Sequence, residues 1–314
     1  MNNKKVDKNE LIAILIMGLF FVLIQGSAIL LTTPFEETTI IEPVWGEEGK
    51  DDPINIVQII VIMLTFTLII LLIAKYAREY IIQIIILGAI GYTAFFGFFL
   101  PIFEIILPGL FELQLILSIL LGVLLVLILY KYPEWYIIDL SGVVIGIAAI
   151  IIFGISLGIF LILLLLIGLA IYDTISVYKT KHMIDLADTV MDLKLPVLLV
   201  VPKIRNYSLI KETKRLKQKL KEGEERDAFF MGLGDIVMPG ILVVATYTSL
   251  PHGLPIALSV ISGTLFGFAI LMNYVVKGKP QAGLPCLCGG AIAGYLISSY
   301  LIFGEIAGLT LPSI

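Results

Sequence analysis

Charged side chains are scarce in this sequence. Only 15% of its 314 residues are Asp, Glu, Lys or Arg, whereas 59% are hydrophobic, and the mean hydropathy is +1.04. A soluble core cannot hide that much apolar surface at this length, so the lipid bilayer must be part of the solvent. The composition excludes a soluble globular protein, and we expect no nucleic-acid partner.

Cysteine and histidine are also nearly absent. Cys286 and Cys288 lie two residues apart in an apolar segment, too close for an ordinary disulfide and too few for a zinc site, and we interpret them as packing residues. The histidines, His182 and His252, fall in loops expected on opposite faces of the membrane, and the chain has no His-Glu-x-x-His motif. A zinc protease and a serine–histidine dyad are thereby excluded, and we expect neither a metal nor a cofactor.

Long apolar runs fill most of the chain. A spanning helix needs about 20 predominantly apolar residues, and nine such windows occur, at residues 11–31, 54–74, 81–103, 113–130, 137–153, 156–178, 229–249, 255–276 and 285–303. Residues 137–178 would form about 60 Å of continuous helix, twice the hydrocarbon thickness, so the chain must fold back near 153–158. The sequence predicts an all-α polytopic membrane protein with nine transmembrane helices, built as one membrane domain over residues 1–314.

Basic residues gather on one side of this arrangement. With the N-terminus inside, 20 of the 21 Lys and Arg residues fall in inner segments and only Lys50 lies outside, as the positive-inside rule requires. We therefore expect a multi-pass protein of the cell membrane with a cytoplasmic N-terminus and an outer C-terminus. Residues 179–228 are expected to form a partly flexible cytoplasmic loop between spans six and seven, with a surface helix at 183–193, an extended piece at 195–202 and a charged connector at 211–227.

Two aspartates lie within the predicted spans, away from the interface. Asp173 precedes the first inner lysine, Lys179, by six residues, and Asp235 follows the last charged loop residue, Asp227, by eight. Both therefore lie roughly 9 to 12 Å below the same inner surface, on consecutive helices, which commonly pack together. Two carboxylates in a poorly solvated site hold one proton between them, so one is a base and the other an acid. Such a pair can activate a water and polarise a peptide carbonyl, and so hydrolyse a peptide bond without a metal or a nucleophile.

The same two aspartates admit another function. A proton-coupled carrier or a cation leak channel could use Asp173 and Asp235 as part of an ion path. Such a path would need polar residues on the outer halves of the same helices, where little apart from Thr246 and Thr248 occurs. The glycines at 232 and 234 are interpreted either as clearance for an approaching substrate backbone or as small residues for helix packing.

The residues around the aspartates resemble a known family. Tyr172 and Asp173 form a YD motif and residues 232–235 read GLGD, which is similar to the paired YD and GxGD motifs of presenilins and signal peptide peptidases, the GxGD intramembrane aspartyl proteases. The resemblance covers the nine-span plan, and the inner 179–228 loop matches presenilins, in the manner of an archaeal-type homologue. It implies an aspartic endopeptidase that cleaves transmembrane helices of single-pass membrane proteins, with Asp173 and Asp235 as the catalytic pair.

A third motif of that family, Pro-Ala-Leu followed by Pro, opens the ninth span. This chain reads KPQAGLPCL there, so Leu284 and Pro285 match, whereas Ala282 and Gly283 stand where Pro and Ala are usual. The resemblance implies a substrate-binding role for Tyr172, Gly232, Leu233, Gly234, Gly283, Leu284 and Pro285. A helical substrate must unwind locally, and pairing its exposed backbone with a protein edge offsets the cost. We expect extended backbone at 283–285 to supply this edge, with a partner from 197–201 or from the residues just before span seven.

Overall fold

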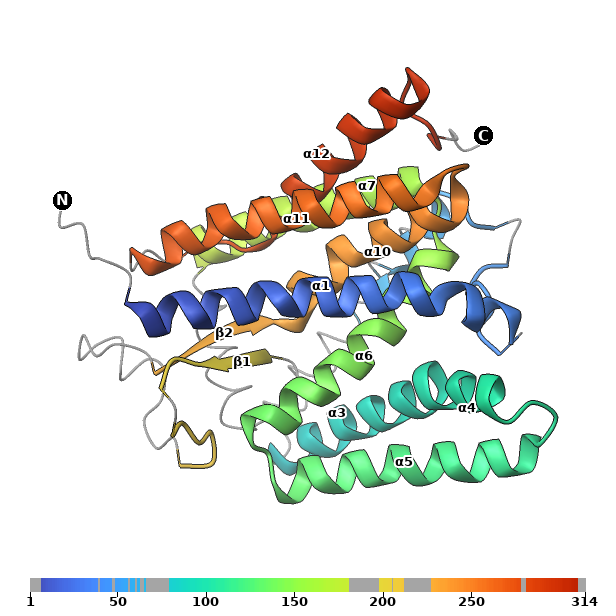
Figure 1. The fold of residues 1–314 in the computed structure, drawn as a ribbon, viewed down its shortest axis with the longest axis vertical. Helices are drawn as coiled ribbons and strands as arrows, with labels where there is room; N and C mark the ends of the chain where they lie inside the picture. The colour runs from blue at the N-terminus through green and yellow to red at the C-terminus, as the bar shows by residue number, and fades with distance from the viewer. Residues whose placement is uncertain are drawn as a thin grey trace.

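A bundle of long apolar helices makes up most of the computed structural model (Figure 1). It describes residues 7–38, 40–46, 49–55, 57–59, 61–62, 65, 79–180, 198–204, 206–211, 227–277 and 281–309. Within these residues, seven helices are long and apolar enough to cross a membrane: Lys8–Glu37, Gln83–Ile106, Phe111–Lys131, Trp135–Ser156, Ile159–Tyr178, Gly253–Val276 and Leu284–Phe303. An eighth apolar helix, Leu233–Ser249, is shorter. The prediction of an all-α polytopic membrane protein is confirmed.

The elements follow the predicted windows in chain order. The helices are α1 (Lys8–Glu37), α3 (Glu79–Ala94), α4 (Leu100–Ile106), α5 (Phe111–Lys131), α6 (Trp135–Ser156), α7 (Ile159–Ile175), α10 (Leu233–Ser249), α11 (Gly253–Val276) and α12 (Leu284–Phe303). The π-helical turn η1 (Phe95–Phe99) joins α3 to α4, and a second one, η2 (Ser176–Thr180), follows α7. The window at 54–74 falls largely outside the described residues, as do the surface helix expected at 183–193 and all but the ends of the connector expected at 211–227.

The predicted fold-back between spans five and six is confirmed. The α6 helix ends at Ser156, and α7 begins after Gly158, whose extended backbone makes the turn. The Gly158 N–H donates to the Lys50 carbonyl at 3.0 Å, and a Cβ at this position would collide with the Asp51 carboxylate. Since Val44 N–H also donates to Ser156 Oγ at 2.9 Å, residues 44, 50 and 51 lie against this turn.

The α10 helix lies at the centre of the bundle. It packs against α1, α6, α7, α11 and α12, and its residues 241–245 are each at most 2% exposed. A helix that is apolar on every side is expected in such a surrounded position. The α11 and α12 helices approach closely beside it, because Gly263 faces Gly290 and a Cβ on either would collide with the backbone of the other.

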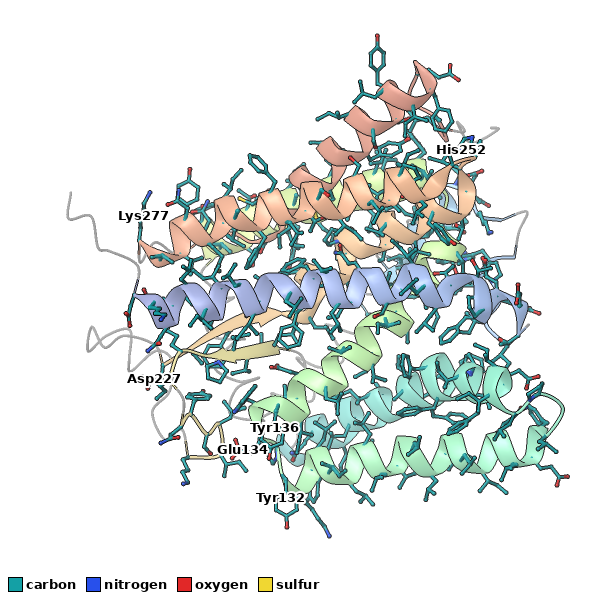
Figure 2. The ribbon with its side chains drawn as sticks, in the orientation of Figure 1. Tyr132, Glu134, Tyr136, Asp227, His252 and Lys277 are labelled. Atoms are coloured by element: carbon teal, nitrogen blue, oxygen red, sulfur yellow. The ribbon has the colours of Figure 1, made fainter. Side chains whose placement is uncertain are left out.

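Polar residues mark the two ends of the bundle. Figure 2 shows Glu134, Asp227 and Lys277 at one end and His252 at the opposite end. Tyr132 and Tyr136, at the same end as Glu134, are 63% and 56% exposed. Exposed aromatic side chains at helix ends are typical of the interface between lipid and water.

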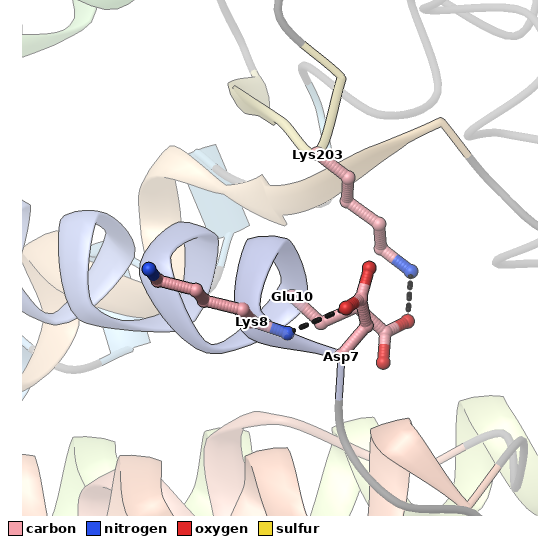
Figure 3. A network of polar contacts seen from close by, with 4 residues as sticks. All are labelled: Asp7, Lys8, Glu10 and Lys203. Carbon is pink, nitrogen blue, oxygen red and sulfur yellow. Dashed lines mark hydrogen bonds and ion pairs between the residues drawn. The ribbon is translucent and has the colours of Figure 1, made fainter.

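A short antiparallel sheet lies against α1 and α6. Strand β1 (Leu198–Pro202) pairs with β2 (Ala228–Gly232), with Leu198 opposite Gly232. The extended piece predicted at 195–202 is therefore confirmed over 198–202. Just past β1, Lys203 Nζ lies 2.8 Å from Glu10 Oε1 near the start of α1 (Figure 3). The same Nζ lies 4.3 Å from the ring centroid of Phe229. These contacts tie the sheet to the N-terminal helix.

Candidate active site

Asp173 lies near the C-terminal end of α7 and points into the bundle. It is 3% exposed, whereas Tyr172, the preceding residue, is 62% exposed. Adjacent residues on a helix point about 100° apart, so Asp173 faces the interior of the bundle while Tyr172 faces its outer surface. A π-helical turn, η2, follows at Ser176, and such turns occur frequently at functional sites.

Asp235 enters the site from the first turn of α10. Gly232 is both the last residue of β2 and the N-cap of α10, so strand and helix join without a loop. The backbone N–H of Gly232 donates to the Asp235 carboxylate, which is the acidic half of a capping box. The helix dipole also favours an acidic side chain in this turn. Asp235 is partly exposed, and a Cβ at the exposed Gly234 would meet no atom within 4 Å.

The N-terminus of α12 brings the two aspartates together. Leu284 N–H donates to Asp173 Oδ2 at 3.0 Å, and the Gly283 backbone is a second hydrogen-bond partner of Asp173. A Cβ built on Gly283 would lie 3.1 Å from Asp235 Oδ2. Gly283 therefore contacts one carboxylate through its backbone and leaves room for the other, and the two carboxylates are close enough to interact electrostatically.

The backbone at 283–285 is helical, so the prediction of an extended edge there is wrong. Gly283 has φ −79° and ψ −50°, and Pro285 lies in the first turn of α12. Proline is well suited to this position because its fixed φ fits a helix and its missing N–H would have no intrahelical acceptor there. The free N–H groups of a helix N-terminus suit a carboxylate better than a strand edge would.

A buried cysteine lies beside the aspartates. Cys288, one turn into α12, is fully buried and lies within electrostatic reach of both aspartates. Among the described residues, no group of three or more His, Cys, Asp or Glu side chains could hold a metal ion. What this part of the chain presents is a pair of carboxyl groups, backbone N–H donors and an opening beside Gly234.

Comparison with known proteins identifies the family. A family model described as signal-peptide peptidase, presenilin aspartyl protease matches residues 17–304. The chain belongs to this family. Two solved structures described as a presenilin family intramembrane aspartate protease, in C222 and P2 space groups, are 30% and 32% identical to it, with TM-scores of 0.62 and 0.64; each comparison covers 91% of this chain and 96% of the other. A search of the curated proteins gave no match.

The protein is thus a multi-pass intramembrane aspartyl protease of the presenilin family. Most of the site residues predicted for this protease converge. Asp173, Asp235, Gly232, Gly283 and Leu284 meet where α7, α10 and α12 come together.

The side chains of two predicted substrate-binding residues face other surfaces than the aspartates do. Tyr172 is largely exposed on α7, and Leu233 is buried against α6, where its Cδ1 would lie 3.4 Å from a Cβ at Gly146. Leu233 therefore holds the start of α10 in place, and its position gives it a packing role in the free protease.

Sequence reasoning missed one polar residue of this region. Asp139 falls near the start of the span predicted at 137–153, where a carboxylate can reach the interface, but it is 3% exposed and its Oδ1 accepts a hydrogen bond from Val200 N–H at 2.8 Å. The sequence signal was present, because Asp139 follows the interfacial Trp135 by one helical turn and then only apolar or small residues follow. Its partner on β1 could not be found without the fold.

Proposed function

We propose that Asp173 and Asp235 are the catalytic pair of this protease and that its substrates are transmembrane helices of single-pass membrane proteins. The observation that carries the proposal is the meeting of the two carboxyl groups at the start of α12, where Gly283 bonds to Asp173 through its backbone and Asp235 interacts electrostatically with Asp173. Such a pair shares one proton and titrates as a unit. No cofactor is required for the reaction.

The chemistry follows from one proton held between two carboxyl groups. The ionised member accepts a proton from a water, whose oxygen attacks the peptide carbonyl carbon while the protonated member hydrogen-bonds the carbonyl oxygen. The resulting gem-diol loses its amine when the C–N bond breaks and a carboxyl group donates a proton to the departing nitrogen. The exposed side of Gly234 supports the entry of a substrate backbone beside Asp235.

The outer edge of β2 is the edge that we propose for the substrate strand. Lys203 N–H donates to the Asp227 carbonyl at 2.8 Å, which continues the register of the sheet. In an antiparallel pair, hydrogen-bonded and non-hydrogen-bonded pairs alternate, so the pair of Val200 and Phe230 is non-hydrogen-bonded. The N–H and C=O of Phe230 therefore point away from β1, along an edge that leads through Gly232 to Asp235. Strand addition there would keep an unwound substrate backbone paired.

The opposite edge, that of β1, is less suited to a substrate. Val200 N–H is already bonded to Asp139, and Pro202 has no N–H to donate. This proposed edge replaces the one expected at 283–285, and its two strands fall in the segments predicted as partners of that edge, at 197–201 and just before span seven. We propose that Gly232, Gly234, Gly283, Leu284 and Pro285 surround the bound substrate. Leu233 would support them from the side of α6, and Tyr172 would contact the substrate only where it passes the outer surface of α7.

We propose nine transmembrane helices, with residues 54–74 as the second, a cytoplasmic N-terminus and an outer C-terminus. The segment 179–228 would then be a cytoplasmic loop of a single membrane domain in the cell membrane. Support comes from the placement of Asp227 and Lys277 at the end of the bundle opposite His252 (Figure 2), together with the positive-inside rule. Water would enter from the cytoplasmic face, and substrates would run from outside to inside.

The carrier and channel functions lack a path in the described outer half of α10. Its residues 241–245 are closely packed. The hydroxyls of Thr246 and Thr248 donate to carbonyl groups of their own helix, at 2.9 and 3.1 Å. A continuous polar route past Asp235 toward the outer surface is not formed by these residues.

Cleavage of a reconstituted single-pass substrate tests the proposal. We expect Asp173→Ala and Asp235→Ala each to lower the rate on the order of 10³-fold or more, because neither carboxyl group can serve as both acid and base. The matched control is Glu112→Gln, an exposed carboxylate in the first turn of α5, which should cleave like the unaltered protease. Residual cleavage in both aspartate variants would contradict the proposal that Asp173 and Asp235 are the catalytic pair. Ion flux that depends on the aspartates, without proteolysis, would favour the carrier function.

A further inference from the structure

Asp139 is a buried carboxylate that the proposed mechanism does not use. It lies near the start of α6, where Oδ1 accepts from Val200 N–H at 2.8 Å. Its Oδ2 is buried and has no hydrogen-bond partner among the described residues. An ionisable group in such surroundings costs solvation free energy that an apolar side chain would not. Its hydrogen bond to Val200 N–H, however, holds β1 in a defined position on α6.

This attachment holds the sheet by the edge opposite the proposed substrate. The N–H of Val200 points away from β2, because Val200 and Phe230 form a non-hydrogen-bonded pair. Asp139 therefore reaches the sheet from outside, and its bond does not compete with strand pairing. A second carboxylate of the same helix end continues the attachment: Glu134 accepts from Ser208 Oγ at 2.6 Å and from Leu209 N–H at 3.1 Å.

The contacts of β1 with the face of α6 below Asp139 are apolar. Asp139, Gly142 and Gly146 are spaced by three and four residues, so they share one face. Leu199 of β1 lies over Gly142, where a Cβ would come within 2.9 Å of Leu199 Cδ2, and Leu233 of α10 lies over Gly146. Leucine side chains on a glycine surface pack closely but without direction. The bond from Asp139 adds a directional contact between this face and β1 itself.

We propose that Asp139 is a positioning residue that fixes the register of the β1–β2 sheet on α6, and thereby the peptide bond of the substrate that reaches the aspartates. The strand β2 carries the substrate edge and continues directly into α10, whereas Asp173 stands on a separate helix. A shift of the sheet along α6 would therefore move the substrate relative to Asp173. The inference rests on the proposed strand addition to β2.

The ends of the cleavage products test this inference. The full-length protease is reconstituted with a single-pass substrate, and the products are identified by mass spectrometry for Asp139→Leu, Asp139→Asn and Ser141→Ala. The Asp139→Leu variant should cut at additional positions displaced by about two residues, because strand pairing repeats with a period of two. The Asp139→Asn variant should keep the original position, since its amide oxygen can still accept from Val200 N–H. Ser141, whose hydroxyl bonds within α6 to Ile138 O at 2.8 Å, is the matched control.

A second variant keeps the test decisive if Asp139→Leu does not fold. In Gly142→Ala, the added methyl group would press on Leu199 and displace β1 while Asp139 remains, so the same displaced products are expected. Cleavage by both Asp139→Leu and Gly142→Ala at the original position alone would overturn the inference. If the Asp139→Leu protein does not fold, cleavage by Gly142→Ala at the original position alone would overturn the inference.

Hydrogen exchange separates this inference from the proposed function. Without substrate, Asp139→Leu should speed amide exchange in β1 and β2 and leave exchange in α11 unchanged. If the unaltered protease cleaves but the variants neither displace the products nor speed exchange, the inference fails and the proposed function stands. If the unaltered protease cleaves nothing while exchange in the strands depends on Asp139, the proposed function fails instead.

Discussion

Leu284 N–H donates to Asp173 Oδ2 at 3.0 Å, across 111 residues of sequence. This bond joins the end of α7 to the start of α12, and it places Gly283 between the carboxyl groups of Asp173 and Asp235. The segment that corresponds to the third motif of the family thus adjoins both aspartates that we propose as the catalytic pair. Its departure from Pro-Ala-Leu in this chain has a local consequence, because glycine occupies the position nearest Asp235.

Gly283→Ala should slow cleavage without abolishing it. The added Cβ would lie 3.1 Å from Asp235 Oδ2 and 3.7 Å from Leu271 Cδ2, so the carboxylate must move by a few tenths of an ångström. Because misplacement by 1 Å can cost about 10²-fold, we expect a loss of about 10-fold, mainly in kcat. Steady-state cleavage in proteoliposomes measures it.

The control for that variant lies on the same helix. A Cβ at Gly289 would meet no atom within 4 Å, so Gly289→Ala should cleave normally. A Gly283→Ala protease as fast as the unaltered one would mean that the start of α12 adjusts freely around Asp235.

Two helical glycines should respond to alanine with opposite signs. At Gly154 in α6, a Cβ would lie 2.6 Å from Val244 Cβ on α10 and 3.2 Å from the Ile241 carbonyl, so Gly154→Ala should destabilise the protein by about 1 to 3 kcal/mol. At Gly168 in α7, nothing lies within 4 Å, so Gly168→Ala should be neutral or stabilising by up to about 1 kcal/mol. Thermal unfolding in one detergent compares them, and equal shifts in Tm would contradict the close packing of α6 on α10.

The ion pair of Lys203 and Glu10 should contribute measurably to stability. Their side chains are 15% and 14% exposed, and Lys203 also lies 4.3 Å from the ring centroid of Phe229. Partial burial makes the pair stronger than an exposed one, so Lys203→Met should cost about 1 to 2 kcal/mol. Combining it with Glu10→Gln in a double-mutant cycle should give a coupling of about 1 kcal/mol.

Lys203→Arg tests whether charge alone explains that effect. It keeps the positive charge and should retain most of the stability, although arginine and lysine differ in geometry. A coupling energy near zero would show that the contact between α1 and the sheet (Figure 3) is held by apolar packing.

The sequence predicted what the bilayer dictates. Lipid requires long apolar helices, so the windows found by composition correspond to α1, α3 with α4, α5, α6, α7, α10, α11 and α12. The need for a turn between α6 and α7 followed from the length of the apolar run. The matching depth of Asp173 and Asp235 followed from the fixed rise of a helix. Each of these predictions depends on the composition and length of a single segment and on no contact between segments.

Lateral contacts could not be predicted in the same way. The bond from Asp139 to Val200 joins residues 61 positions apart, and nothing in either segment alone indicates the other. The backbone at 283–285 was predicted as extended, although proline followed by apolar residues is equally a helix start. Tyr172 could have been placed better, because a side chain next to Asp173 on a helix cannot share its direction.

Because β2 continues directly into α10, the direction of the Asp235 side chain depends on how many residues separate it from the end of the strand. The strand ends at Gly232 and the carboxylate follows three residues later, within the first turn. One residue more or fewer between them would rotate the carboxylate by about 100° around the helix axis. The number of residues between Gly232 and Asp235 therefore fixes the direction in which the Asp235 side chain leaves α10, which is toward the start of α12.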